Sequence, residues 1–165
     1  ADASAFKKSE ALVTLLSRLN ERRAAIELEQ KPMILKVSPD MADDERDAVI
    51  ACIEKGLADG LCVANTTTQR PASLQAPEGV IAQRGGLSGR PLFERTVALV
   101  GTMHEALPDT PIIGVGGIFT AEDAKAVLDA GARLVEIYTS LVYEGPGLPS
   151  KLAAGLVELG WKPTE

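Results

Sequence analysis

The chain has 165 residues, of which 45% are hydrophobic, and a formal net charge of −6. This length and composition fit a single domain with a substantial hydrophobic core. Basic and acidic residues are interspersed, and the basic, aromatic-rich surface that nucleic acid requires is not evident, so we expect no nucleic-acid binding. No apolar run approaches the length of a membrane span, and we expect neither a membrane segment nor a signal peptide.

Cysteine and histidine usage argues against metal and triad chemistry. Cys52 and Cys62 fall on a predicted helix and a predicted strand, and their spacing matches neither a CxxC pair nor a metal site, so we expect buried free thiols. His104 is the single histidine, and it lies along the apolar stripe of a predicted helix. We therefore expect a packed histidine there, and neither a zinc site nor a Ser-His-Asp triad.

The first predicted elements are a helix and one βα unit. Apolar residues recur at helical spacing over residues 9–29, which predicts an amphipathic helix within a leading segment, residues 1–30. Residues 33–37 form an apolar run that predicts a strand, with Lys36 inside it. Acidic residues then open a helix that Gly56 closes.

The second strand, residues 61–64, leads into Asn65 and Thr66. Residues 72–91 are too long and too glycine-rich for a plain connector, and such loops in compact domains are usually functional or mobile. Backbone amides of residues 85–89 are suited to line an anion or a planar ligand. A helix over residues 92–107 follows.

The stretch from residue 111 to residue 147 organises the rest of the chain. Residues 111–114 predict a buried strand that ends in a glycine turn with Gly116 and Gly117. Thr120 has the chemistry of an N-cap for the next helix, and Gly131 supplies its C-terminal stop. A strand over residues 134–137 follows, and a closing helix spans residues 152–159. Two consecutive strand ends with glycines and hydroxyls predict a phosphate cradle, although a purely structural turn is the alternative.

After the first helix the order is β-α, β-loop-α, β-α, β-α. Four parallel strands with right-handed crossovers predict either half of a (β/α)8 TIM-type barrel or a small open α/β sheet. On such strands Lys36 is either a cation held against a ligand that becomes anionic, or a lysine that snorkels at a strand end. Asn65 and Thr66 are suited to bind a planar polar ligand, or form an ordinary turn.

Five segments carry a resemblance to a known family. ILKVSPD, VANTTTQRP, GGLSGRPL, PIIGVGG and EIYTSLVYEGPG, in this order, resemble dihydroorotate dehydrogenases, and the second and third resemble the class 2, quinone-linked and membrane-associated enzymes. The resemblance runs over about residues 31–147. It implies a (β/α)8 barrel with FMN at the C-terminal mouth, which oxidises dihydroorotate to orotate in pyrimidine biosynthesis and reduces a quinone. It also implies a peripheral enzyme on the cytoplasmic side of the inner membrane.

The resemblance also implies roles for individual residues. Lys36 would be catalytic and lie beside the flavin, and Asn65 and Thr66 would bind orotate. Relatives often have Thr at the position of Ala64, where a backbone contact to the flavin would survive. The remaining implied FMN contacts are backbone groups of the loops and a phosphate closure, from Ser88, Gly89, Gly116, Gly117, Tyr138 and Thr139.

The resemblance implies that residues 31–165 are the C-terminal half of the barrel. The family's serine general base and its quinone-binding helical region match nothing in this sequence, so we expect the isolated chain to be inactive or nearly so. We expect it to pair with the N-terminal half or with a second copy of itself. Two alternatives stay open: a phosphate-binding barrel enzyme without flavin, and a non-catalytic half-barrel.

Overall fold

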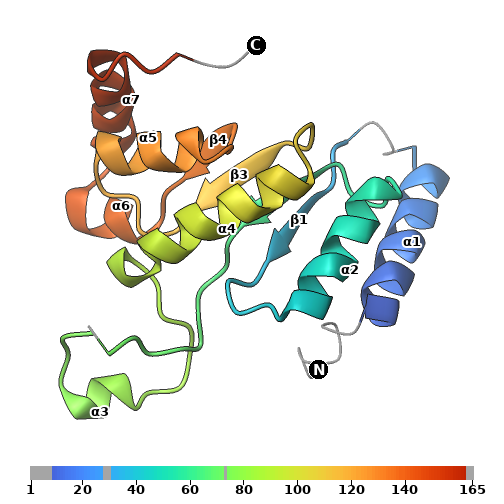
Figure 1. Ribbon diagram of the computed structural model, residues 1–165, viewed down its shortest axis with the longest axis horizontal. Coiled ribbons are helices and arrows are strands. Elements are labelled where there is room, and N and C mark those ends of the chain that lie inside the picture. The colour runs from blue at the N-terminus through green and yellow to red at the C-terminus, as the bar shows by residue number, and fades with distance from the viewer. Residues whose placement is uncertain (1–8, 28–30, 73, 163–165) are drawn as a thin grey trace.

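The computed structural model describes residues 9–27, 31–72 and 74–162, and Figure 1 shows their arrangement. The strands are β1 (Ile34–Val37), β2 (Gly60–Val63), β3 (Ile112–Val115) and β4 (Leu134–Glu136). The helices are α1 (Ser9–Ala25), α2 (Asp43–Glu54), α3 (Glu78–Ile81), α4 (Phe93–Ala106), α5 (Ala121–Asp129), α6 (Thr139–Glu144) and α7 (Leu148–Glu158), with a 3-10 turn, η2 (Arg90–Leu92), before α4.

The four strands form one parallel sheet in the order β1-β2-β3-β4. Lys36 pairs in register with Cys62, Cys62 with Ile113, and Ile113 with Leu134. Because registered residues of parallel strands point to the same side, these four side chains form one row on one face. The predicted parallel arrangement of four βα units is confirmed.

The two faces of the sheet differ in burial. Helices α2, α4 and α5 cover one face (Figure 1), and the core there includes Leu61, Val63 and Ile112, none of which is exposed. On the opposite face Leu134 is 61% exposed and Lys36 is also exposed. The uncovered face is the one that would line the interior of a closed barrel.

Local sequence signals explain how α5 begins. Thr120 is its N-cap: Thr120 Oγ1 accepts a hydrogen bond from the Asp123 N–H at 3.2 Å, and the Asp123 carboxylate accepts one from the Thr120 N–H at 3.1 Å. This reciprocal capping box satisfies two of the four unpaired N–H groups of the first turn. The predicted N-cap is confirmed.

Two glycines have a packing role beyond the predicted one. Gly114 lies within β3, inside the predicted strand, and an added methyl group there would collide with Val127 of α5. Gly131 does follow α5 with a φ of 115°, but a methyl group there would also collide with the His104 ring of α4. These glycines therefore permit close helix packing as well as turns. His104 is a packed residue, as predicted.

Several boundaries differ from the sequence predictions. The first helix ends at Ala25, and the predicted residues 28 and 29 lie outside the described part. Helix α7 begins at Leu148, because Pro149 is favourable in a first helical turn. The short helix α6 and the helix α3 within the long loop were not predicted, since six and four residues are too few to show a repeating helical pattern.

The chain's leading helix is attached to the second one. Asn20 Nδ2 of α1 donates to the Leu57 carbonyl oxygen after α2 at 2.9 Å, and Leu16 is buried. Cys52 and Cys62 are both free and buried, as predicted. Among the described helices, none combines the length and apolarity needed to cross a bilayer.

Candidate functional site

A cavity of about 250 Å³ lies at the carboxyl ends of the strands. Every residue that the sequence analysis named as a site candidate lines it: Lys36, Ala64, Asn65, Thr66, Ser88, Gly89, Gly116, Gly117, Tyr138 and Thr139. These residues come from four strand ends and one long loop. The fold thus brings together five segments that are far apart in the sequence.

The sheet itself supplies the floor of the cavity. Lys36 of β1 and Glu136 of β4 both line it, and Cys62 of β2 lies in register with Lys36. Cys62 Sγ contacts Glu136 Oε2 at 3.5 Å. Lys36 makes no hydrogen bond or ion pair with the residues that the structure describes. Its ammonium group is therefore open to a ligand.

The Cys62 thiol stays protonated in this setting. Burial raises its pKa to about 11; the positive charge of Lys36 acts against this shift, and the carboxylate of Glu136 adds to it. The thiolate is the nucleophilic form of cysteine, so Cys62 is not an activated nucleophile. Its place on the floor is that of a small packed side chain.

Asn65 and Thr66 leave β2 directly above the floor. Asn65 Oδ1 accepts a hydrogen bond from the Thr66 N–H at 2.9 Å, which fixes the orientation of the Asn65 amide. The Asn65 Nδ2 donors have no partner among the described residues. An amide held in this way presents two N–H donors to a ligand in the cavity.

A polar cluster behind the β2 exit holds this segment in place. Asp40 Oδ1 accepts a hydrogen bond from Thr67 Oγ1 at 2.6 Å, and its Oδ2 accepts one from the Thr68 N–H at 2.7 Å. Arg95 of α4 pairs with Asp40 at 3.0 Å and also donates to Thr67 Oγ1 and to the Pro39 carbonyl oxygen. This cluster joins the loops after β1 and β2 to α4.

The ionised form of Asp40 is favoured by its partners. Burial by itself raises the pKa of this carboxyl, but the hydrogen bonds from Thr67 and Thr68 and the charge of Arg95 outweigh burial, so the net shift lowers the pKa below 3.8. The cluster was missed in the sequence analysis. Its one sequence signal is an aspartate after a predicted strand end, and Arg95 lies far away on a helix.

Residues 74–89, here called the loop wall, bring Ser88 and Gly89 to one side of the cavity. Thr67 and Leu87 form an antiparallel bridge, with N–H to carbonyl oxygen distances of 3.1 and 2.7 Å. An added methyl group at Gly86 would collide with the Thr66 side chain. The loop wall therefore packs directly on the segment that carries Asn65 and Thr66.

Residues 116–123, here called the turn wall, bring Gly116, Gly117 and Ile118 to another side of the cavity. Gly117 has a φ of 72°, and a methyl group there would lie 2.6 Å from the Phe93 backbone nitrogen. Asp123 Oδ2 pairs with Arg90 Nη1 at 2.6 Å and accepts the Phe119 N–H at 3.0 Å. Arg90 also stacks over the Phe93 ring at 4.5 Å. The turn is thus packed against the start of α4.

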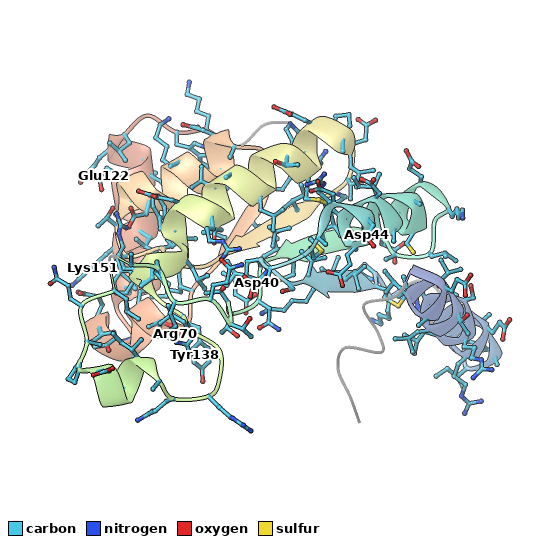
Figure 2. All side chains as sticks on the ribbon, turned by 60° about the horizontal axis from the view of Figure 1, so that its bottom comes forward. Asp40, Asp44, Arg70, Glu122, Tyr138 and Lys151 are labelled. Carbon is cyan, nitrogen blue, oxygen red and sulfur yellow. The ribbon has the colours of Figure 1, made fainter. Side chains whose placement is uncertain are left out.

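The loop wall meets the start of α6 at Ser88 and Thr139. The hydroxyl groups of these residues lie 2.9 Å apart, and a methyl group at Gly89 would lie 3.1 Å from Thr139 Cγ2. Tyr138 stands at the rim of the cavity with 76% of its surface exposed. Figure 2 shows the Tyr138 side chain pointing outward from the end of the β4 segment.

The composition of the cavity favours an organic anion over a metal ion. The described residues contain no group of three or more His, Cys, Asp or Glu side chains placed to hold a metal. The cavity instead combines the Lys36 ammonium, the Asn65 amide and a glycine-lined rim with hydroxyl groups. Apolar side chains between these polar groups suit the faces of a planar ring. The chemistry of the residues present therefore fits FMN.

Comparison with known sequences gives a consistent result. The profile of the family described as "Dihydroorotate dehydrogenase" matches residues 3–159. The chain is 46% identical over 151 residues to "Dihydroorotate dehydrogenase (quinone)" of Brucella ovis, which covers 89% of this chain and 41% of that protein. The Brucella melitensis protein of the same name is 45% identical over 151 residues, which again cover 89% of this chain and 41% of that protein. The chain thus spans less than half the length of these relatives.

Solved structures show the same likeness. The crystal structure of DHODH from Eimeria tenella in complex with ferulenol superposes with a TM-score of 0.79 at 33% identity, covering 94% of this chain and 45% of that one. The ligand-free form from the same organism gives a TM-score of 0.81 at 32% identity, covering 94% and 48%. Of the two predicted architectures, the partial (β/α) barrel is therefore confirmed.

Proposed function

The chain belongs to the dihydroorotate dehydrogenase family, and from that premise we propose that it forms the FMN- and orotate-binding part of a quinone-linked dihydroorotate dehydrogenase. The observation that carries this proposal is the convergence of all ten candidate residues on one cavity at the strand ends. Each of the five sequence segments, taken alone, could have a purely structural explanation. A shared binding site explains why all five meet around a single cavity with a free ammonium group on its floor.

The proposed roles follow from the position of each side chain. Lys36 supplies a compact positive charge to the floor, where it favours a ligand that gains electrons. Asn65 donates from its free amide to orotate, and Thr66 lines the same end of the cavity. The FMN contacts come from both walls and the rim: Ala64, Ser88, Gly89, Gly116, Gly117, Tyr138 and Thr139.

The reaction requires loss of a hydride and a proton from dihydroorotate. FMN, when bound, accepts the hydride and passes the electrons to a quinone. The chain's own residues orient the substrate through Asn65 and keep positive charge beside the site through Lys36. We propose that the general base comes from the part of the relatives' length that this chain does not match. The isolated chain is then expected to be inactive.

The uncovered sheet face supports a partner for this chain. Ile34 is 37% and Leu134 is 61% exposed on that face, and β1 and β4 are the edge strands of the described sheet. Exposed edges and apolar surface favour pairing with further strands. We propose that the N-terminal half of the same enzyme closes the barrel here, with self-association as the alternative. In the whole enzyme we propose quinone reduction at the cytoplasmic side of the inner membrane.

One experiment tests the proposed activity. The protein that contains this chain is loaded with FMN and mixed with dihydroorotate without oxygen, and the flavin absorption band is followed. We expect the band to bleach and to return when a quinone is added. A protein that does not take up FMN would instead support the flavin-free barrel enzyme, which needs the glycine rim but not Lys36 with Asn65.

A further inference from the structure

The loop wall has little hydrophobic support, although it lines the cavity. Its helix α3 contains no buried residue, and most side chains from Gln75 to Gly86 are exposed. A segment with few buried apolar contacts lies at the low end of local stability. Polar contacts must therefore determine where this wall sits.

Arg70 provides those polar contacts. It lies just after the Asn65-Thr66 segment, and its guanidinium donates all five of its N–H groups to backbone carbonyl oxygens. Two acceptors belong to the chain just before Arg70, and three belong to the far part of the loop wall. They are Thr68 (3.2 Å), Gln69 (3.2 Å), Ile81 (3.2 Å), Gln83 (3.0 Å) and Gly85 (2.9 Å).

The last of these contacts leads directly to the cavity. Gly85 is followed by Gly86, which packs on Thr66, and then by Leu87, which forms the bridge with Thr67. Ser88, the next residue, touches Thr139 on the opposite side. A shift of the Gly85 carbonyl group therefore displaces residues that line the cavity on two sides.

We propose that Arg70 is a positioning residue: its guanidinium clamps the loop wall to the segment after β2 and so sets the places of Thr66 and Ser88. Figure 2 shows Arg70 on the loop side of the molecule, away from the helical layer. The part of this inference that concerns ligands rests on the proposed function. The clamp itself does not.

The chemistry of the clamp requires arginine. Five carbonyl oxygens are reached from one planar group, whereas a lysine ammonium has only three donors and no fixed fork. Among the described residues, no carboxylate forms an ion pair with Arg70. The guanidinium is thus committed to backbone acceptors, and Arg70→Lys is expected to restore only part of the clamp.

Hydrogen exchange of the full chain tests the clamp without any ligand. Arg70→Gln and Arg70→Lys are compared with Arg84→Gln, which alters an exposed arginine of the same loop that has no hydrogen bond in the described part. We expect amides of residues 81–88 to exchange at least about tenfold faster in Arg70→Gln, because several charge-assisted hydrogen bonds are lost. Arg70→Lys falls between, Arg84→Gln matches the unmodified protein, and strand β3 is unchanged in all.

Ligand titration then tests the positioning role. In the FMN-loaded protein that contains this chain, we expect Arg70→Gln to raise the dissociation constant of orotate and the KM of dihydroorotate by about tenfold, since binding must now order the loop. We expect kcat to change by less than about threefold, because Arg70 touches no reacting group. This division between KM and kcat separates positioning from a general loss of folded protein.

Each contrary result overturns a defined part of the inference. Unchanged exchange over residues 81–88 in Arg70→Gln, or equal acceleration in β3, removes the clamp. Faster loop exchange with unchanged orotate affinity removes the positioning role. If the unmodified protein binds neither FMN nor orotate, the proposed function fails, and the exchange data still decide the clamp.

Discussion

The turn wall and the loop wall line the same cavity but are held in different ways. The turn wall is anchored in the core: Ile118 and Asp123 are 2% and 5% exposed, and Gly117 packs on the Phe93 backbone. The loop wall is exposed along most of its length and depends on a short bridge and on Arg70. One wall is thus fixed by packing and the other by polar contacts.

Because they are held differently, the two walls should differ in how well they tolerate substitutions. Packed backbone gives way only when a helix moves with it, because interiors are dense. Exposed loops yield locally and leave the core intact. Substitutions in the turn wall should therefore affect folding, whereas those in the loop wall should affect ligands first.

The largest effect is expected when one glycine in each wall is replaced by alanine and the two losses of stability are compared. Gly117→Ala places a methyl group 2.6 Å from the Phe93 nitrogen, on a backbone with a φ of 72°. We expect a loss of about 3 kcal/mol in the free energy of unfolding, from backbone strain and overpacking together. Gly79→Ala in the loop wall meets nothing within 4 Å, and we expect a change within about 0.5 kcal/mol.

Urea unfolding of both variants measures this difference. Equal urea midpoints for Gly117→Ala and Gly79→Ala would show that the turn wall is no more rigid than the loop wall.

The next largest effect is expected on flavin reduction, from the loss of the Lys36 ammonium group on the cavity floor. Lys36→Ala removes the free ammonium group from the cavity while leaving both walls in place. We expect FMN to remain bound and its reduction by dihydroorotate to slow by about a hundredfold or more, as when a preorganised charge is lost. Lys36→Arg should also be slow, because a planar fork does not replace a compact ammonium.

Stopped-flow reduction measures the rate, with Lys151→Ala as control. Lys151 is an exposed lysine of α7 that does not line the cavity, and Figure 2 labels it. If the flavin in Lys36→Ala is reduced at the same rate as in the unmodified protein, Lys36 has no part in the reaction and is simply a lysine at a strand end.

Much of the turn wall could be predicted from sequence, because its signals are local. Thr120 and Asp123 are close in the chain, and glycines with a capped helix specify the turn. Lys36 and Asn65 were found because strand ends meet at one edge of a parallel sheet. The order of the elements predicted only their place at that edge; their roles were implied by the resemblance to dihydroorotate dehydrogenases.

The contacts that hold the loop wall could not be predicted in the same way. The acceptors of Arg70 extend as far as Gly85, and Arg95 reaches Asp40 from helix α4. The acceptors of Arg70 are backbone carbonyl groups, which leave no mark on the sequence, and Asp40 is far from Arg95 in the chain. Only the folded chain shows which groups these arginines contact.

Low pH should weaken the contacts of two carboxylates beside the cavity, Asp123 in the turn wall and Asp40 behind the β2 exit. We expect this loss of stability to be smaller than the effects above. Burial by itself raises the pKa of Asp123, but hydrogen bonds from Arg90 and from the Phe119 and Thr120 N–H groups outweigh it, so the pKa is lowered, as it is for Asp40. A lowered folded-state pKa gives stability that is present above 3.8 and is lost as pH falls through the folded-state pKa.

Asp123→Asn tests this dependence. We expect it to lower the unfolding free energy at neutral pH by about 1–2 kcal/mol, and to reduce the fall of stability below pH 4. Asp129→Asn, which alters an exposed carboxylate at the end of α5, is the control. An unchanged acid slope in Asp123→Asn would show that this carboxylate does not link the turn wall to pH.

The smallest effect is expected where the loop wall meets the start of α6. Ser88→Ala removes the 2.9 Å contact with Thr139 but leaves the backbone of both segments unchanged. One exposed neutral hydrogen bond contributes about 0.5–1.5 kcal/mol, so we expect FMN affinity to fall about threefold and the unfolding midpoint to fall only slightly. Thr139→Ser keeps the hydroxyl group and should retain affinity, whereas Thr139→Val should behave like Ser88→Ala. Fluorescence titration of FMN distinguishes these cases, with Ser150→Ala on the exposed side of α7 as control. Full affinity in both Ser88→Ala and Thr139→Val would mean that the loop wall does not depend on the start of α6 and is held only by its own supports.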